Sequence, residues 1–91
     1  ALQQLKSNIE FAEVKLKQDQ NQALRYKKLY ENNSVAKVEY ENMQLTYENS
    51  EANLKSLKQQ YEALKLQAKQ QELSQNAANA IKSVVGNESG R

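Results

Sequence analysis

The chain has 91 residues and a formal net charge of +2, and only 38% of its residues are hydrophobic. Such a composition cannot supply a thick globular core, and the absence of proline together with only two glycines favours long exposed helices over a sheet. Lysine and glutamate are interspersed without the basic block that a nucleic-acid-binding protein shows, the densest cluster being Arg25, Lys27 and Lys28.

Missing residue types exclude several classes of function. The sequence has no cysteine and no histidine, which removes disulfides, thiolate metal sites and the commonest general base. It has no glycine-rich phosphate loop and no apolar run near the ~20 residues that span a bilayer. The nearest carboxylate pairs, such as Glu10 with Glu13, fall on a predicted exposed helix surface. We therefore expect neither an enzyme nor a cofactor or metal site.

Residues 1–31 carry apolar side chains at alternating spacings of three and four, the pattern of positions a and d in a heptad repeat. Nothing in the segment breaks a helix, so the sequence predicts one helix of roughly 45 Å at 1.5 Å per residue. Sustained heptad order also argues against disorder. The predicted core positions are Leu2, Leu5, Ile9, Ala12, Leu16, Asp19, Ala23, Tyr26 and Tyr30, of which only Asp19 is polar.

A short polar turn at residues 32–36 separates this helix from a second heptad pattern. Asn32 and Asn33 tolerate the left-handed backbone conformation that ends helices. Ser34 or Asn33 is expected to cap the second helix by accepting a hydrogen bond from a free backbone N–H, because Ala36 lacks a capping side chain. The sequence therefore predicts a tight turn between two helices.

The second heptad pattern predicts a helix over residues 37–85 that folds back along the first. The fold class is accordingly all-α, an antiparallel two-helix coiled-coil hairpin whose second helix is longer than the first. The core positions on this side are Ala36, Tyr40, Met43, Tyr47, Ser50, Leu54, Leu57, Tyr61, Leu64 and Ala68.

The two patterns also predict a register. If the chain reverses about residue 33, facing core positions have residue numbers that sum to 66. Large side chains then face small ones at several layers, as close packing at constant helix separation requires. Asp19 faces Tyr47, whose hydroxyl is expected to hydrogen-bond the carboxylate. The pairs that decide the register are Tyr30 with Ala36, Tyr26 with Tyr40, Ala23 with Met43, Asp19 with Tyr47, Leu16 with Ser50 and Ile9 with Leu57.

The second helix is predicted to outlast the first. Leu2 faces Leu64 in this register, and a helical pattern nevertheless continues to Val85. Gly86 is the first strong stop signal, so residues 86–91 are expected to form a polar tail. We expect a fragment of a larger protein whose first helix has lost its N-terminal part.

A second apolar stripe follows position f of the second helix, on the side away from the predicted core. A simple two-stranded coiled coil keeps this position polar. Single exposed apolar residues are normal, and that is one interpretation of the stripe. The other is that hairpins lie side by side, with the stripe as a lateral contact between copies. The stripe consists of Val38, Leu45, Ala52, Leu66 and Leu73, while Phe11, Val14 and Leu24 point away from the core on the first helix.

The turn and its flanks resemble the α-hairpin of periplasmic adaptor proteins, also called membrane fusion proteins or HlyD-like secretion proteins. The segment that carries the resemblance reads RYKKLYENNSVAKVEYENMQLTYENSEANLKSL. The resemblance implies a subunit that links an inner-membrane transporter to a TolC-like outer-membrane channel in tripartite efflux or type I secretion. It further implies a periplasmic location, with the parent protein anchored at the inner membrane. Such hairpins pack side by side into a tube and dock their tips on the channel.

The family's docking signature is an Arg, a Leu four residues later and a Ser seven residues beyond that. Carried over, these positions fall on Arg25, Leu29 and Ala36, so the serine is replaced. Ser34 is expected to take over the capping role of that serine. The residues that the resemblance places at the docking tip are Arg25, Leu29, Asn33, Ser34, Val35 and Ala36.

Two other classes of function are compared with this one, and one of them remains as an alternative. A cytoplasmic coiled-coil scaffold or dimerisation segment would explain the heptads, the mixed charges and the lack of catalytic motifs. It does not explain a tight Asn-Asn-Ser turn in mid-pattern or the apolar stripe at position f. An amphipathic membrane-surface helix does not fit, because the apolar stripe is narrow and no basic face flanks it.

Overall fold

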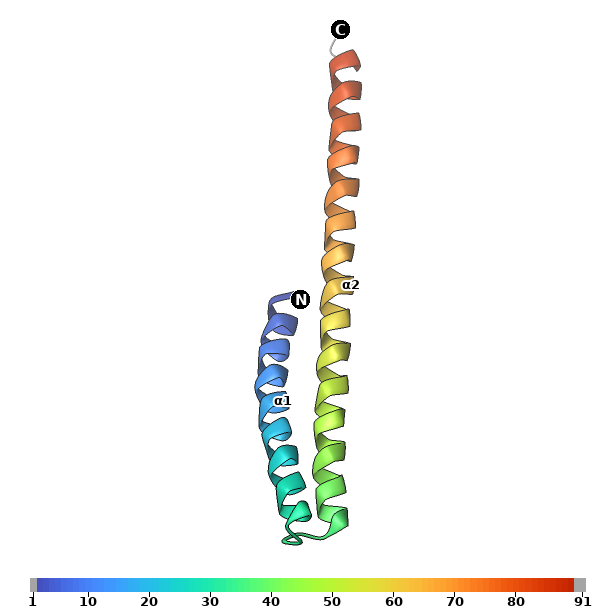
Figure 1. Cartoon of the computed structure of the whole chain (residues 1–91). Helices are drawn as coiled ribbons and strands as arrows, with labels where there is room; N and C mark the ends of the chain where they lie inside the picture. Colours follow the sequence, from blue (N-terminus) through green and yellow to red (C-terminus); the bar gives the residue numbers. More distant parts are fainter. Residues whose placement is uncertain (1, 90–91) are drawn as a thin grey trace. The chain divides into compact units, whose positions relative to one another are not determined.

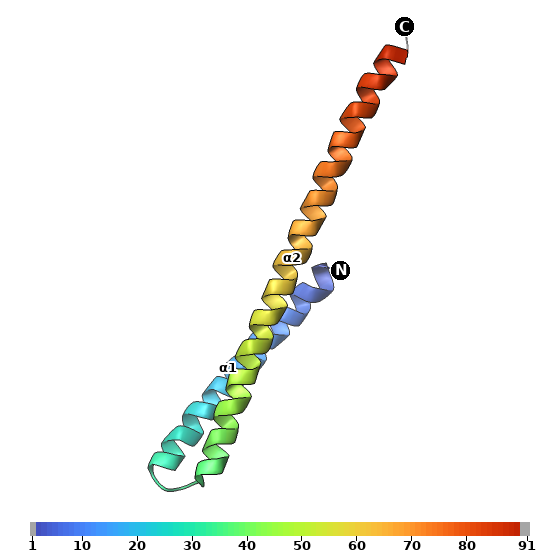
Figure 2. The same cartoon turned by 90° about the vertical axis from the view of Figure 1, so that its right-hand side faces the viewer.

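The computed structural model describes the backbone of residues 2–89 and the side chains of residues 2–84. It contains two helices, α1 (Leu2–Glu31) and α2 (Lys37–Ser89), and no strand within these residues. Both views show α1 running antiparallel beside the first part of α2 (Figures 1 and 2). The prediction of an all-α antiparallel hairpin with a longer second helix is confirmed. The chain divides into two compact units, Ala1–Tyr61, which holds the hairpin, and Glu62–Arg91.

The hairpin is held together by one narrow seam. Every predicted core position of residues 2–61 is buried or half-buried, with the exception of Ala36, which is exposed. A full burial of a leucine side chain contributes about 1.5–3 kcal/mol, and the half-buried positions contribute less. A two-helix seam leaves one flank of each side chain open to water, so stability is spread thinly over many layers. The buried residues are Leu5, Ala12, Ala23, Ser50 and Leu54.

The detailed pairing in the seam differs from the predicted one. The ring of Tyr40 stacks on that of Tyr30, with centroids 5.1 Å apart and an interplanar angle of 10°. Tyr40 was expected to face Tyr26, and Asp19 accepts a hydrogen bond from Ser50, where Tyr47 was predicted as its partner. In knobs-into-holes packing each side chain lies among four residues of the facing helix. A single register of the two helices therefore allows each side chain several contact partners. Side-chain direction, which a sum of residue numbers ignores, selects the direct contacts.

Backbone hydrogen bonds close the end of α1. The N–H of Ser34 donates to the carbonyl of Leu29 at 2.7 Å, and the N–H of Asn33 donates to the carbonyl of Tyr30 at 2.9 Å. Asn33 has a φ of 58°, the left-handed conformation that asparagine tolerates better than most residues. These two bonds and the positive φ define a Schellman motif. The predicted tight turn at residues 32–36 is present in this form.

The start of α2 corrects the predicted cap. Ala36 is the N-cap residue, because its carbonyl accepts from the N–H groups of Glu39 at 3.1 Å and Tyr40 at 3.3 Å. Among the described residues, neither Asn33 nor Ser34 makes a side-chain hydrogen bond to the first turn of α2. The backbone N–H of Ser34 is bonded to the end of α1, and Ser34 lies two positions before the N-cap residue. The helix therefore begins without a side-chain cap.

The second unit consists of the remainder of α2. All its described side chains, up to Val84, are exposed, including Leu64 at 40%. The helix continues past Gly86 to Ser89, which corrects the predicted end at Val85. Glycine lowers helix stability by about 1 kcal/mol relative to alanine without forbidding the conformation, so a single glycine is a weak stop. The last two residues of the predicted polar tail lie outside the described residues.

Candidate protein interaction site

The hairpin tip combines exposed polar groups with two half-buried apolar residues. Leu29 and Val35 are half-buried, and their partial burial anchors the tip to the seam. The other four residues that the resemblance places there, Arg25, Asn33, Ser34 and Ala36, have exposed side chains. The structure therefore brings all six to one end of the hairpin. Four of them are open to a partner.

Positive charge gathers on the α1 side of this tip. Arg25, Lys27 and Lys28 are all exposed, and Lys28 lies in the last turn of α1, where a cation interacts favourably with the helix dipole. On the α2 side, the Nζ of Lys37 lies 3.7 Å from an Oε1 of Glu41, and both side chains are largely exposed. An exposed pair of this kind contributes little to stability. The charge at the tip is thus available to a partner.

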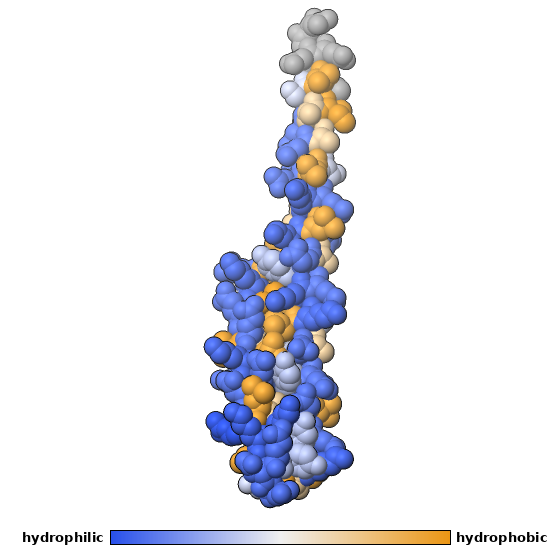
Figure 3. All heavy atoms as spheres, in the orientation of Figure 1, coloured by the Kyte–Doolittle hydropathy of each residue, from blue (hydrophilic) through white to orange (hydrophobic). Residues whose placement is uncertain are grey.

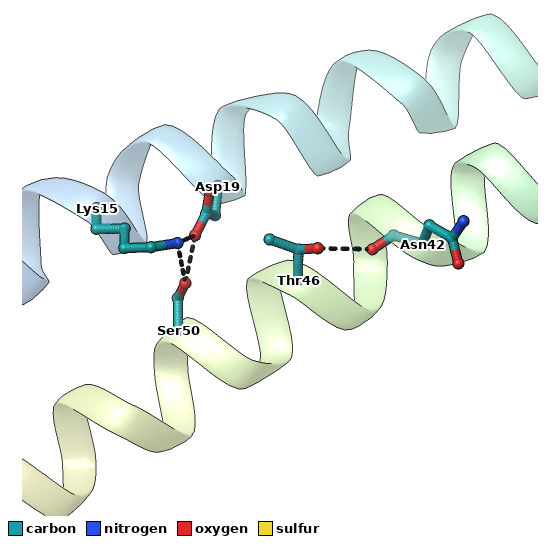
Figure 4. A network of polar contacts seen from close by, with 5 residues as sticks. All are labelled: Lys15, Asp19, Asn42, Thr46 and Ser50. Carbon is teal, nitrogen blue, oxygen red and sulfur yellow. Dashed lines mark hydrogen bonds and ion pairs between the residues drawn. The ribbon is translucent and has the colours of Figure 1, made fainter.

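A polar cluster interrupts the apolar seam midway along the hairpin (Figure 4). The Nζ of Lys15 lies 2.7 Å from Oδ2 of Asp19 and donates to Oγ of Ser50 at 3.3 Å. The hydroxyl of Ser50 in turn donates to the same Asp19 oxygen. The hydrogen bonds from Lys15 and Ser50 hold the pKa of Asp19 below its ordinary value. The cluster joins both helices and leaves no buried polar side-chain atom unpaired among the described residues.

The sequence identified Asp19 as a polar core residue and missed its partners. Lys15 is at position g, four residues before Asp19, and this i,i+4 spacing is the signal that would have found the ion pair. The hydroxyl of Tyr47, the predicted partner, instead donates to Glu51 at 3.3 Å on its own helix. The negative charge of Glu51 raises the pKa of Tyr47. Thr46 also bonds within α2, to the carbonyl of Asn42 at 2.9 Å.

The outward faces of the hairpin carry the apolar residues that the seam does not use. On α2, Val38, Leu45 and Ala52 are exposed, with Leu45 at 55%. On α1, Phe11 is 78% exposed and Val14 is 60% exposed. In the second unit, the predicted lateral residues Leu66 and Leu73 are each 59% exposed. The face drawn in Figure 3 shows apolar patches along the line between the two helices and at their edges, among predominantly hydrophilic surface. No other part of the described chain covers these side chains.

The described residues contain no group of three or more acidic or metal-ligating side chains that could hold a metal ion. No helix in the described part of the chain is long and apolar enough to cross a membrane. Comparisons with protein-family models, with curated proteins and with solved structures found no match. The tip and the outward faces are therefore the surfaces on which a functional proposal depends.

Proposed function

We propose that the chain is the α-hairpin arm of a periplasmic adaptor subunit of a tripartite efflux or type I secretion system. In this role it docks its tip on a TolC-like outer-membrane channel and packs laterally against other copies. The rest of the parent protein connects it to an inner-membrane transporter. The function is mechanical: to set a distance, to align with neighbouring arms and to present a docking end.

The observation that carries this proposal is the construction of the turn. A Schellman motif with one positive φ at Asn33 reverses the chain within five residues, 32–36, between two heptad-patterned helices. A coiled-coil scaffold has no need of so sharp a reversal in mid-pattern, whereas a docking arm needs a blunt and rigid end. Arg25 and Leu29 lie in the last two turns of α1, directly beside that end.

The replaced serine has a limited consequence for this proposal. Position 36 is the N-cap of α2, where a serine hydroxyl would accept a hydrogen bond from the first turn. Alanine removes that bond and one hydroxyl from the docking surface. It does not disturb the Schellman turn, whose hydrogen bonds are made by the backbone of residues 29–34. Docking would then depend on Arg25, on Leu29 and on the exposed polar groups of the turn.

In-cell photocrosslinking tests the docking role. A photoreactive amino acid is placed at position 25, 29 or 36 of the full-length parent protein, with Gln18 and Gln22 as control positions. The controls lie one heptad further from the tip at the same heptad positions as Arg25 and Leu29, and both are exposed. Crosslinks to an outer-membrane channel from the tip positions alone support the proposal. A folded protein that gives no channel adduct, or only adducts with cytoplasmic proteins, contradicts it.

A further inference from the structure

Apart from Arg25 and Lys28 next to the tip, the outward faces of both helices in the hairpin unit carry no charge at heptad positions c and f. Heptad positions c and f point away from the seam, and from residue 4 to 21 on α1 and from 38 to 59 on α2 all 13 of them are uncharged and exposed. Since 26% of the chain is charged, about three charges would be expected there. These two charge-free strips are Gln4, Ser7, Phe11, Val14, Gln18 and Asn21 on α1, and Val38, Asn42, Leu45, Asn49, Ala52, Ser56 and Gln59 on α2.

The pattern of each strip is itself that of a coiled-coil seam. Positions c and f alternate at spacings of three and four, so each strip offers a second a/d-like row on the opposite side from the hairpin core. Uncharged rows suit burial against another helix, because an unpaired buried charge is costly. Small polar residues in the rows, such as Asn49 and Ser56, limit the affinity of one hairpin for another. A contact of limited affinity is consistent with association of hairpins that are already folded.

The charges that flank the strips indicate that the partner is a second copy of this chain. Glu10 and Lys17 border the α1 strip at position b, and Glu48 and Lys55 border the α2 strip at the same position. When the α1 strip of one copy packs antiparallel on the α2 strip of a second copy, equivalent flanking positions lie opposite each other. In one register Glu10 faces Lys55 of the second copy and Lys17 faces its Glu48. Both charges that flank the α1 strip at position b are then paired with opposite charges, and Glu41, which also lies at position b of α2, faces the uncharged Leu24.

Neighbouring registers are unfavourable. A slip of one heptad in one direction places Lys17 opposite Lys55 of the second copy. A slip in the other direction places Glu10 opposite its Glu48, although it also places Lys17 opposite its Glu41. Like charges directly opposite each other destabilise a pairing, and of the three registers only the first places no like charges opposite each other at position b.

The same register matches side chains by size. Phe11, at 78% the most exposed large apolar residue that the structure describes, falls opposite Ala52 of the second copy. Leu45 falls opposite Gln18, and Val14 falls opposite Asn49. Packing a large ring against a small side chain keeps the helix separation constant along the contact. A pairing of α2 with α2 of another copy would leave Phe11 and Val14 uncovered, and for this reason we favour the pairing of unlike faces.

We infer that the α1 strip of one hairpin binds the α2 strip of a second copy. Phe11 packs against Ala52, and the ion pairs are Glu10–Lys55 and Lys17–Glu48. In this arrangement the tips of the two hairpins are at the same height to within about one helical turn. This inference rests on the lateral packing in the proposed function and identifies its partner surface and register. Because the contact joins unlike faces, a row of hairpins has a free α1 strip at one end and a free α2 strip at the other. Copies can therefore add one after another until a ring closes.

Charge reversal within one polypeptide tests the register. Lys17→Glu places a glutamate opposite Glu48 and is expected to weaken self-association about fivefold, from the typical energies of exposed ion pairs. The double variant Lys17→Glu with Glu48→Lys restores an opposite-charge pair and is expected to recover the original association. Lys58→Glu, an exposed reversal at position e outside the contact, is the matched control. Sedimentation equilibrium measures the association, and circular dichroism checks that helicity is unchanged.

Disulfide trapping tests the pairing of unlike faces, which the absence of native cysteine makes unambiguous. Chains that carry Phe11→Cys alone are mixed with chains that carry Ala52→Cys alone under mild oxidation. The expected product is the mixed dimer, in excess over either homodimer. Each chain then contains a single cysteine, so an intramolecular disulfide cannot form. Homodimers of Ala52→Cys alone, or failure of the double charge reversal to restore association, overturn the inference. Channel crosslinks from the tip would survive that result, so the docking role and the lateral contact fail separately.

Discussion

Restoring a side-chain cap at the start of α2 should stabilise the hairpin. Ala36 is the N-cap residue, and a serine at an N-cap is worth about 0.5–2 kcal/mol over alanine. Here the N–H of Glu39 already bonds the Ala36 carbonyl at 3.1 Å, so the new hydroxyl satisfies at most one further donor, that of Val38, or shares the Glu39 donor. We therefore expect Ala36→Ser to add about 0.5–1 kcal/mol, the lower half of that range.

Thermal and urea unfolding followed by circular dichroism measure this gain. For a chain of this size, about 0.5–1 kcal/mol corresponds to a Tm increase of roughly 2–8 °C. Ser34→Ala is the matched control, because Ser34 contributes its backbone N–H to the turn and no side-chain cap. We expect its Tm to stay within about 1 °C of the parent. A neutral Ala36→Ser together with a destabilised Ser34→Ala would show that Ser34 is the true cap and refute the reasoning.

Three further perturbations probe the seam and the turn. The pKa of Asp19 is lower in the folded chain than its unfolded value of about 3.9, so its contribution to stability is full above that value and is lost as pH falls through the folded pKa. Urea unfolding between pH 6 and pH 2 should show this loss, which Asp19→Asn should reduce. Asn33→Ala should lower stability by about 1 kcal/mol and Asn33→Gly should not, because Asn33 has a φ of 58°; equal effects would contradict the role of that conformation. Leu54→Ala, at a buried seam position, should cost about 2 kcal/mol in urea unfolding, and a cost below about 0.5 kcal/mol would mean that the seam is not the source of stability.

The fold was predictable from the sequence because one physical signal dominated it. Alternating spacings of three and four on both sides of an Asn-Asn-Ser break determine two helices, their antiparallel course and the residues of their shared seam. The predicted bounds 1–31 and 32–36 for the first helix and the turn agree with Leu2–Glu31 and with the start of α2 at Lys37. Few long-range choices remain in a hairpin with so short a connection.

Direct contacts within the seam were not predictable in the same way. Whether Tyr40 stacks on Tyr30 or meets Tyr26 depends on side-chain direction, since both lie within reach at one register. The partner of Asp19 likewise depends on Lys15 and Ser50, which the heptad pattern assigns to a flank and to a different layer. The end of α2 was missed because glycine is only a weak stop.

At the candidate site, the structure shows a difference in side-chain exposure among tip residues that the sequence did not distinguish. The six tip residues were expected together and lie together, but Leu29 and Val35 are half-buried while the others are exposed. The cap was assigned to the wrong residue, since a hydroxyl near the start of a helix signals a cap only if the backbone places it at the N-cap. Ser34 sits two residues too early for that.

The closure of the turn by backbone atoms alone separates the shape of the tip from its surface chemistry. The Ser34–Leu29 and Asn33–Tyr30 hydrogen bonds use no side chain, and only Asn33 must accept a positive φ. The side chains at positions 32, 34 and 36 can therefore be exchanged for others while the chain reversal keeps its geometry. For protein engineering, this makes the tip a small graftable platform on which binding specificity can be rewritten without redesigning the helices that carry it.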